Sequence, residues 1–345
     1  MNNLNLTCGT FALGDFALDG GAVLLGAVLA YETYGTLAPD GRNGVVLGHG
    51  YTSSQHAAGL HPGDAEPGWW DGVIGPGRAI DTGRFFVVCS NMLGSSFGST
   101  GPKSVDPRTG KPYGPNFPAL TIADIVRAQK HLADGLGIKH VVLAAGLSFG
   151  GFQALQWGEA YPDFVTGVAV VCSAPRGIAG QSEAVRQILE RDPNWHGGRH
   201  YDKPGAMAET LRAMRVETMR RYGYAEILAD RGLDEAGVTA AIDAAARAWA
   251  SVFDGNSMLV LGDTQERVAL DSDFAKLRGK KLLYVLCASD RLFPQSLAPG
   301  VMAQLQAVGV EAAYFPLRSR HGHAASGSEP EKWAPALADL IRNLS

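Results

Sequence analysis

The sequence is poor in the features that mark secreted, membrane-bound and metal-binding proteins. Its 345 residues contain only four cysteines, which lie far apart in the chain: Cys8, Cys89, Cys172 and Cys287. The last three sit in apolar runs, where a buried free thiol is ordinary, so we expect neither a disulfide nor a Cys-x-x-Cys metal site. The first residues do not form a basic segment followed by an apolar one, and the longest apolar run, residues 22–30, is too short to cross a bilayer. We therefore expect a cytoplasmic protein that does not bind a membrane.

Charge is also scarce, at 19% of the residues. Thirty Lys and Arg stand against 34 Asp and Glu, a net charge of -4, and no block of five or six like charges occurs. This balance does not favour nucleic acid as a partner. The hydrophobic fraction of 46% is enough for a large core, and the length fits about two lobes.

What the sequence has is a regular alternation of strand and helix patterns. Residues 16–34 read as two extended runs around the turn Asp19-Gly20-Gly21, a β-hairpin. Amphipathic spacing predicts a helix over 121–136, with Thr121 as its cap, and further helices over 149–159 and 333–344. Short apolar runs typical of buried parallel strands separate these helices: 45–47, 85–89, 141–143, 165–172, 282–286 and 312–316. The fold class is therefore α/β, a doubly wound and mostly parallel sheet.

One segment breaks this pattern. Residues 176–261 are dense in Arg and Glu and contain no strand-like run. We interpret this segment as a helical lid inserted into one α/β core, which then comprises residues 1–175 and 262–345.

A candidate nucleophile lies at the end of one strand. Gly146, Ser148 and Gly150 form a Gly-x-Ser-x-Gly motif that follows the apolar run 141–143 and opens a helix. A sharp turn from strand to helix leaves no room for side chains two positions on either side of the serine, so glycines there let Ser148 project over the sheet. We predict a nucleophile elbow, against the alternative of an ordinary glycine turn.

A serine nucleophile requires a histidine base and a carboxylate that orients it, in the chain order Ser, Asp, His. Asp290 follows the apolar run 282–288 and so lies in the loop at the carboxyl end of a strand; the alternative is a surface turn. His321 and His323 both lie in the loop after the last strand, and only one can be the base. We assign His323, because it follows Gly322, and treat His321 as a polar loop residue.

The oxyanion formed during acyl transfer needs two N–H donors, one from the residue after the nucleophile and one from an early strand-to-helix loop. We assign the backbone N–H groups of Phe149 and Tyr51. His49 and His56 flank that loop, and we interpret both as structural hydrogen-bonding residues.

Other chemistries fit less well. Residues 98–104 look like a phosphate-binding loop, but Pro102 separates the glycine from Lys103 and the spacing is wrong. Neither the His321/His323 pair nor the His196/His200 pair is accompanied by a metal-binding motif. We therefore expect no metal.

These motifs lie within a longer resemblance that covers most of the chain. The segments GWWDGVIGPG (68–77), AIDT (79–82), CSN (89–91), STGP (99–102) and GFQALQW (151–157) are similar to the homoserine O-acetyltransferase family of the α/β-hydrolase fold. The resemblance implies an acyl-enzyme formed by a Ser, Asp, His triad, which supports Ser148, Asp290 and His323. It implies no cofactor.

The departures from the family concern the substrate. Members typically carry an Asp after the catalytic histidine, thought to hold the ammonium of homoserine, and here that position is Ala324. Members also present an Arg with a Tyr seven residues on for the carboxylate, and we match these to Arg212 with Met219 in place of the tyrosine. A buried ammonium without a carboxylate partner is costly, so an apolar acceptor pocket fits better.

We therefore predict a serine carboxylesterase that hydrolyses small esters, acetyl esters in particular. The alternative is an acetyl-CoA-dependent O-acetyltransferase for homoserine or another alcohol. A third class, a catalytically silent binding protein, conflicts with the intact Ser148, Asp290 and His323. The expected partner is a small-molecule ester, and whether the chain forms a homodimer is left open.

Overall fold

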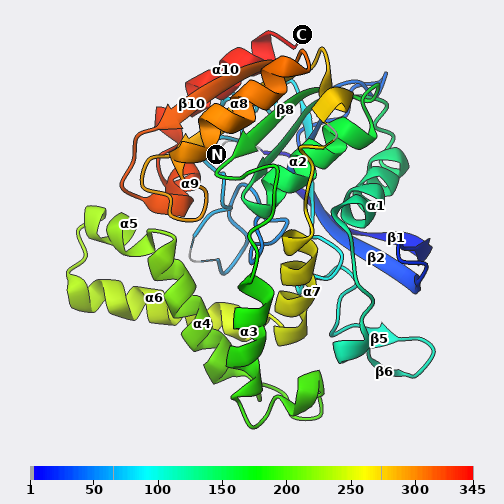
Figure 1. Ribbon diagram of the computed structural model, residues 1–345, viewed down its shortest axis with the longest axis vertical. Coiled ribbons are helices and arrows are strands. Elements are labelled where there is room, and N and C mark those ends of the chain that lie inside the picture. Colours follow the sequence, from blue (N-terminus) through cyan, green and yellow to red (C-terminus); the bar gives the residue numbers. More distant parts are fainter. Residues whose placement is uncertain (1–3, 65, 273, 345) are drawn as a thin grey trace.

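A mixed sheet of eight strands forms the centre of the computed structural model, which describes residues 4–64, 66–272 and 274–344 (Figure 1). In sheet order the strands are β1 (Thr7–Ala17), β2 (Val23–Tyr34), β4 (Phe86–Ser90), β3 (Gly44–Gly48), β7 (Val141–Leu147), β8 (Val165–Val171), β9 (Lys281–Cys287) and β10 (Glu311–Leu317). The six strands from β4 to β10 are parallel, and β2 pairs antiparallel with both β1 and β4. The strands β5 (Val105–Asp106) and β6 (Lys111–Pro112) form a separate small hairpin. The predicted α/β-hydrolase sheet is confirmed.

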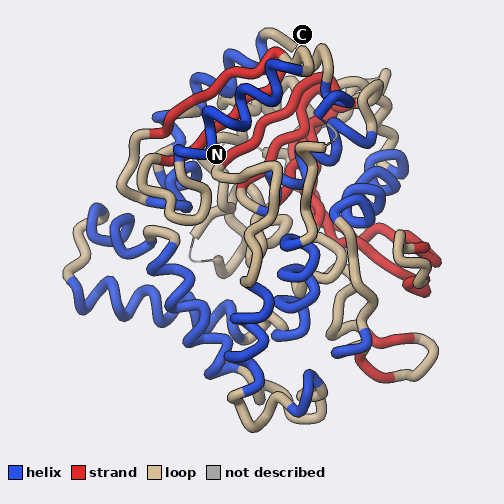
Figure 2. Tube along the Cα trace, in the orientation of Figure 1, coloured by secondary structure: helices blue, strands red, loops and turns tan. Residues whose placement is uncertain are grey.

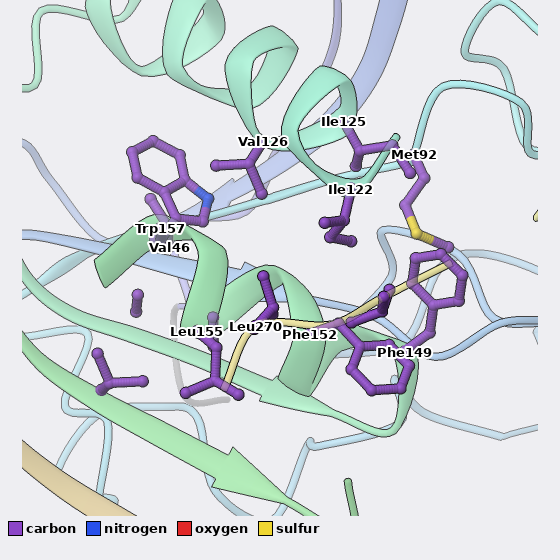
Figure 3. Packing of buried hydrophobic residues seen from close by; sticks show 14 of the residues in the cluster. Val46, Met92, Ile122, Ile125, Val126, Phe149, Phe152, Leu155, Trp157 and Leu270 are labelled. Atoms are coloured by element: carbon purple, nitrogen blue, oxygen red, sulfur yellow. The ribbon is translucent and has the colours of Figure 1, made fainter. Parts of the chain in front are cut away.

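Helices cover both faces of this sheet. One face carries α1 (Ile122–Gly135), α2 (Phe149–Ala160) and α8 (Ala298–Ala307), and the other carries α10 (Ala334–Arg342) with the short α9 (Ala325–Ser328) nearby. Successive strand residues therefore enter opposite cores: Val46 packs on the first face, and Val45 and Leu47 pack on the second. Figure 3 shows the first core, where α1 packs over the large side chains of α2.

The predicted helix boundaries hold where the sequence carries a cap. Thr121 accepts the backbone N–H of Asp124, and the Asp124 carboxylate accepts the backbone N–H of Thr121, a complete capping box before α1. The hairpin differs from its prediction, because β1 begins at Thr7. Register shifts on either side of Gly14 interrupt the regular alternation on which a strand prediction depends.

The segment between β8 and β9 is helical. It contains α3 (Gln181–Glu190), α4 (Ala208–Arg221), α5 (Tyr224–Asp230), α6 (Glu235–Ala250) and α7 (Gly255–Glu266). Figure 1 and Figure 2 show these helices gathered beside one end of the sheet. The two ends of the segment pair through backbone hydrogen bonds between Gly177 and Val268 and between Leu270 and Pro175. We call residues 178–267 the helical insertion; because α7 continues to Glu266, it ends later than the expected residue 261.

All four cysteines are free, with Cys8 exposed and the other three buried. Within the described residues no helix has the length and apolar character needed to cross a membrane.

Candidate active site

Ser148 lies at the turn between β7 and α2, where the sequence predicts an elbow. Its backbone has a positive φ, with φ 58° and ψ -121°, a conformation that a non-glycine residue rarely adopts. The backbone N–H of Ser148 donates to Val171 on β8 at 2.9 Å, and its carbonyl accepts from Gly151 at 2.8 Å. Hydrogen bonds on both sides therefore hold the strained serine at the carboxyl end of the parallel strands.

The glycines of the motif are required by close backbone contacts. A Cβ atom on Gly146 would lie 1.9 Å from the carbonyl oxygen of Gly150, and one on Gly150 would lie 1.9 Å from the carbonyl oxygen of Gly48. No side chain fits at such distances. Strand β3, strand β7 and helix α2 therefore meet through glycines, as the elbow prediction requires.

Asp290 and His323 are brought together from loops after β9 and β10. The Asp290 carboxylate accepts the Nδ1–H of His323 through Oδ2 at 2.8 Å, and both side chains are buried. Its second oxygen, Oδ1, accepts the backbone N–H groups of Leu292 at 2.8 Å and Phe293 at 3.3 Å. Because Nδ1 donates, the other ring nitrogen, Nε2, is left as an acceptor. Nε2 is buried and has no hydrogen-bond partner within the described chain.

His321 and His49 form hydrogen bonds with groups other than Asp290 and Ser148. His321 contacts Asp230 on α5 through Nε2 at 2.8 Å and Ser328 through Nδ1 at 2.9 Å. His49 contacts the carbonyl of Gly50 through Nδ1 at 2.8 Å and accepts the backbone N–H of Met92 through Nε2. Complete burial lowers the pKa of His49 to about 4, so this ring is neutral at pH 7. Both act as hydrogen-bonding residues of the scaffold.

Tyr51 and Phe149 lie together beside the serine. Their rings stack at 6.4 Å with an interplanar angle of 7°, and the Tyr51 hydroxyl donates to the carbonyl of Met258 on α7. Neither the Tyr51 nor the Phe149 backbone N–H donates to another group in the part of the chain that is described. Two free donors therefore flank the nucleophile, an arrangement suited to an oxyanion.

A cavity of about 380 Å³ opens at Ser148 beneath the helical insertion. Tyr222 and Phe293 line it, and the His323 ring lies 4.7 Å from the Tyr222 ring and 5.8 Å from the Phe293 ring. His323 therefore packs against two residues that line the cavity with Ser148, although no hydrogen bond joins its Nε2 to Ser148 in the described residues. Most other lining side chains are apolar and come from α3, α4 and α7 or the adjoining loops: Ile178, Val185, Ile188, Met214, Met258 and Leu292.

The predicted substrate-binding pair Arg212 and Met219 does not reach this cavity. Arg212 forms ion pairs with Glu209 on its own helix and with Asp243 on α6. Met219 is buried against Val238 and Ile242 of α6. The assignment was wrong because the register along α4 was set one turn too early, which selects side chains that face α6.

Tyr222, three residues after Met219, lines the cavity, and Arg215 reaches its edge through Thr52. The Arg215 guanidinium donates to the hydroxyl of Thr52, which lines the cavity, at 2.8 Å and lies over the Trp249 ring at 5.3 Å. Its Nε is buried without a partner, and no described carboxylate pairs with it. Burial raises the pKa of Tyr222, and Arg215 and Arg221 partly offset this rise. These two residues have the Arg and Tyr spacing of seven, the signal that would have found them.

Known proteins resemble most of this chain in sequence and in fold. A family model described as "alpha/beta hydrolase fold" matches residues 45–316. A homoserine O-acetyltransferase from Pelobacter propionicus is 36% identical over 345 residues, covering 94% of this chain and 93% of the relative. This chain belongs to the homoserine O-acetyltransferase family.

Solved structures related to the family include two kinds of enzyme. Esterase E22 matches with a TM-score of 0.87 at 27% identity, covering 97% of this chain and 100% of the other. Homoserine O-acetyltransferase from Bacillus anthracis matches with a TM-score of 0.85 at 25% identity, covering 97% of each chain. The overall structure therefore does not separate an acyltransferase from an esterase, and the decision depends on the residues around the cavity.

Position 324, where the sequence resemblance led us to expect an Asp, carries Ala. Ala324 follows the histidine that pairs with Asp290, and its backbone N–H donates to the carbonyl of Tyr222 at 3.0 Å. The loop around His323 is therefore attached to the end of α4, but position 324 carries no carboxylate. Arg215 and Tyr222 have the Arg and Tyr spacing of seven that the sequence resemblance led us to expect.

Proposed function

We propose that this chain is an acetyl-CoA-dependent homoserine O-acetyltransferase that works through an acyl-enzyme on Ser148. The observation that carries the proposal is Arg215, a cation beside the cavity with a buried Nε and no carboxylate partner among the described residues. The Arg215 side chain is partly buried and its guanidinium has only the Thr52 hydroxyl as a hydrogen-bond partner among the described residues, so an anion beside it would gain a charge-assisted hydrogen bond. The carboxylate of an amino-acid acceptor would supply the missing partner.

In the first half of the proposed reaction, Ser148 becomes acetylated. Its Oγ attacks the thioester carbon of acetyl-CoA while Nε2 of His323 takes the hydroxyl proton. The N–H groups of Tyr51 and Phe149 hold the developing oxyanion. The carbon–sulfur bond then breaks, and His323 returns the proton to the leaving thiolate, which departs as free CoA.

In the second half, homoserine takes the acetyl group. Arg215 and the hydroxyl of Tyr222 hold its carboxylate, which directs the side-chain hydroxyl toward the acyl carbon. His323 takes the hydroxyl proton as the oxygen attacks, and it returns this proton to Ser148 when the ester bond to the enzyme breaks. Asp290 stabilises the imidazolium in both halves.

The ammonium of homoserine needs a different partner from the one the family usually provides. We propose Glu217, which lies on α4 with Arg215 and lines the cavity. No described cation forms an ion pair with Glu217. Because Glu217 is exposed, this contact is worth about 1 kcal/mol or less.

Ala324 supports a second candidate, the serine carboxylesterase. Without a carboxylate at that position the amino group is held less firmly, and water can take the acyl group from Ser148. The apolar lining of the cavity suits a simple ester as well as it suits an acyl chain.

Two arginines one turn apart on α4 test the proposal. Arg215→Ala should lower kcat/KM for homoserine by roughly tenfold to a hundredfold, the scale of one or two charge-assisted hydrogen bonds, and leave hydrolysis of p-nitrophenyl acetate nearly unchanged. Arg212→Ala is the matched control, since its ion pairs lie against α6, and both activities should persist. Equal losses in the two variants, or no loss for homoserine in Arg215→Ala, would contradict the proposal and favour the esterase.

A further inference from the structure

A second cavity lies away from Ser148, beside the antiparallel end of the sheet. It has a volume of about 700 Å³ and is open to solvent. Its lining includes the side chains of Cys8, Glu32, His61 and Asp64, none of which takes part in the proposed acyl transfer. Three different elements supply them: β1, β2 and the loop between β3 and β4. Such a collection of thiol, imidazole and carboxylate groups is characteristic of metal ligands.

Strand pairing fixes the first two groups. Cys8 on β1 lies directly opposite Glu32 on β2, so both side chains project from the same face of the sheet. His61 completes the set, with its Nε2 2.9 Å from Oε1 of Glu32. One donor atom from each of these three residues lies within 4.8 Å of the others. For comparison, the ligands of a tetrahedral zinc ion bound at about 2.1 Å lie roughly 3.4 Å apart.

The environment of Glu32 resembles the outer shell of a metal site. Its second oxygen, Oε2, accepts the Tyr34 hydroxyl at 2.7 Å and contacts Nδ1 of His56 at 3.0 Å. Nε2 of His56 contacts the carbonyl of Gly59 at 3.1 Å. These bonds hold a carboxylate whose side chain is only 4% exposed, so that Oε1 faces Cys8 and His61. Hydrogen bonds that orient a ligating carboxylate in this way typically raise metal affinity by tenfold to a hundredfold.

We propose that Cys8, Glu32 and His61 form a binding site for Zn²⁺. One thiolate, one imidazole nitrogen and one carboxylate oxygen match the ligands that zinc takes in proteins, and a soft thiolate disfavours Mg²⁺ and Ca²⁺. Binding releases the Cys8 proton to solvent. The fourth position faces the open cavity, where a water molecule would complete the tetrahedron.

The site would be structural. A bound ion joins the edge strand β1 to β2 and to the loop that carries His61, which continues from the segment with the proposed oxyanion donor Tyr51. Fixing three segments that are distant in sequence stabilises the folded state in proportion to the binding free energy. Zn²⁺ should therefore raise Tm without entering the acyl-transfer chemistry.

Zn²⁺ and Co²⁺ binding to the reduced, tag-free chain test the site. The wild-type protein should bind one Zn²⁺ per chain, measured by competition with a chromophoric chelator, and its Co²⁺ complex should show a thiolate-to-metal charge-transfer band. Cys8→Ser and His61→Gln should each weaken binding by about a hundredfold or more. Cys8→Ser should also abolish the charge-transfer band. His131→Gln, which alters an exposed histidine on α1, is the control and should bind as the wild type does.

The proposal fails if the wild type binds Zn²⁺ no more tightly than Cys8→Ser or His61→Gln does, or if its Co²⁺ complex lacks the thiolate band. Circular dichroism of the metal-free proteins shows whether each variant folds. The Tm difference with and without Zn²⁺ provides a second readout: it should be positive in the wild type and the control, and close to zero in the two ligand variants. A similar rise in all four proteins would contradict the assignment.

Discussion

Replacing Asp290 with asparagine tests the catalytic pair through the hydrogen bonds of both carboxylate oxygens. Oδ1 of Asp290 accepts two backbone N–H groups, from Leu292 and Phe293, and Oδ2 accepts Nδ1 of His323. An asparagine must keep its carbonyl oxygen toward the two backbone donors, because turning its NH₂ group toward them would leave buried donors facing each other. Its NH₂ group therefore faces His323.

The consequence is the wrong tautomer of the base. Nδ1 of His323 has to accept from the asparagine, so the ring proton moves to Nε2, the nitrogen proposed to take the proton of Ser148. A base in this state cannot act, and the loss of the imidazolium's negative partner adds to the defect. We expect kcat for p-nitrophenyl acetate hydrolysis to fall by about ten thousandfold, which corresponds to roughly 5.5 kcal/mol.

The chain offers a matched control in its second Asp and His pair. Asp230 contacts His321 at 2.8 Å, the same separation as Asp290 and His323, but outside the proposed catalytic residues. Asp230→Asn should keep kcat within a few fold of the wild type. The reasoning is refuted if the two substitutions cost the same, or if a folded Asp290→Asn protein keeps wild-type kcat.

Three further predictions follow from the scaffold and the acceptor site. Gly150→Ala places a Cβ 1.9 Å from the carbonyl oxygen of Gly48, so both the midpoint of urea unfolding and the activity should fall; unchanged values in both would contradict the packing argument. Ala324→Asp should lower KM for homoserine by roughly tenfold, measured by steady-state kinetics, and leave ester hydrolysis similar or slower. His49 has its folded pKa lowered to about 4 by burial, so the unfolded chain binds its proton first as the pH falls. This effect leaves the free energy of unfolding unchanged above about pH 6.5 and lowers it by roughly 3 kcal/mol toward pH 4. The free energy of unfolding, measured with urea between these pH values, should therefore fall much less in His49→Gln than in the wild type.

The fold, the elbow at Ser148 and the contact between Asp290 and His323 could be predicted because their signals follow from single strands and the segments after them. The elbow is a strand, a Gly-x-Ser-x-Gly motif and a helix in sequence, and close contacts at Gly146 and Gly150 require those glycines. Asp290 and His323 follow the adjacent parallel strands β9 and β10, whose carboxyl ends meet at one edge of the sheet. The structure places the two side chains in contact, as the predicted order of strands requires.

The residues of α4 at the cavity were harder to predict because the side chains within one helical turn point in different directions. Arg212 and Arg215 are chemically identical, and only packing against α6 determines which of them turns away from the cavity. The tyrosine seven residues after Arg215 was the available signal. The Cys8, Glu32 and His61 cluster had no comparable signal, because strand register and a loop bring together residues that have no motif spacing.

The fate of the acetyl group tests the central claim most directly. The protein is mixed with acetyl-CoA labelled in the acetyl group and with homoserine, and the label in O-acetylhomoserine is compared with the label in free acetate. Ser148→Ala serves as the blank. We predict that most of the label appears in O-acetylhomoserine with wild-type protein and that neither product forms with Ser148→Ala. Label found mainly as acetate, at saturating homoserine, would contradict the transferase and identify water as the acceptor.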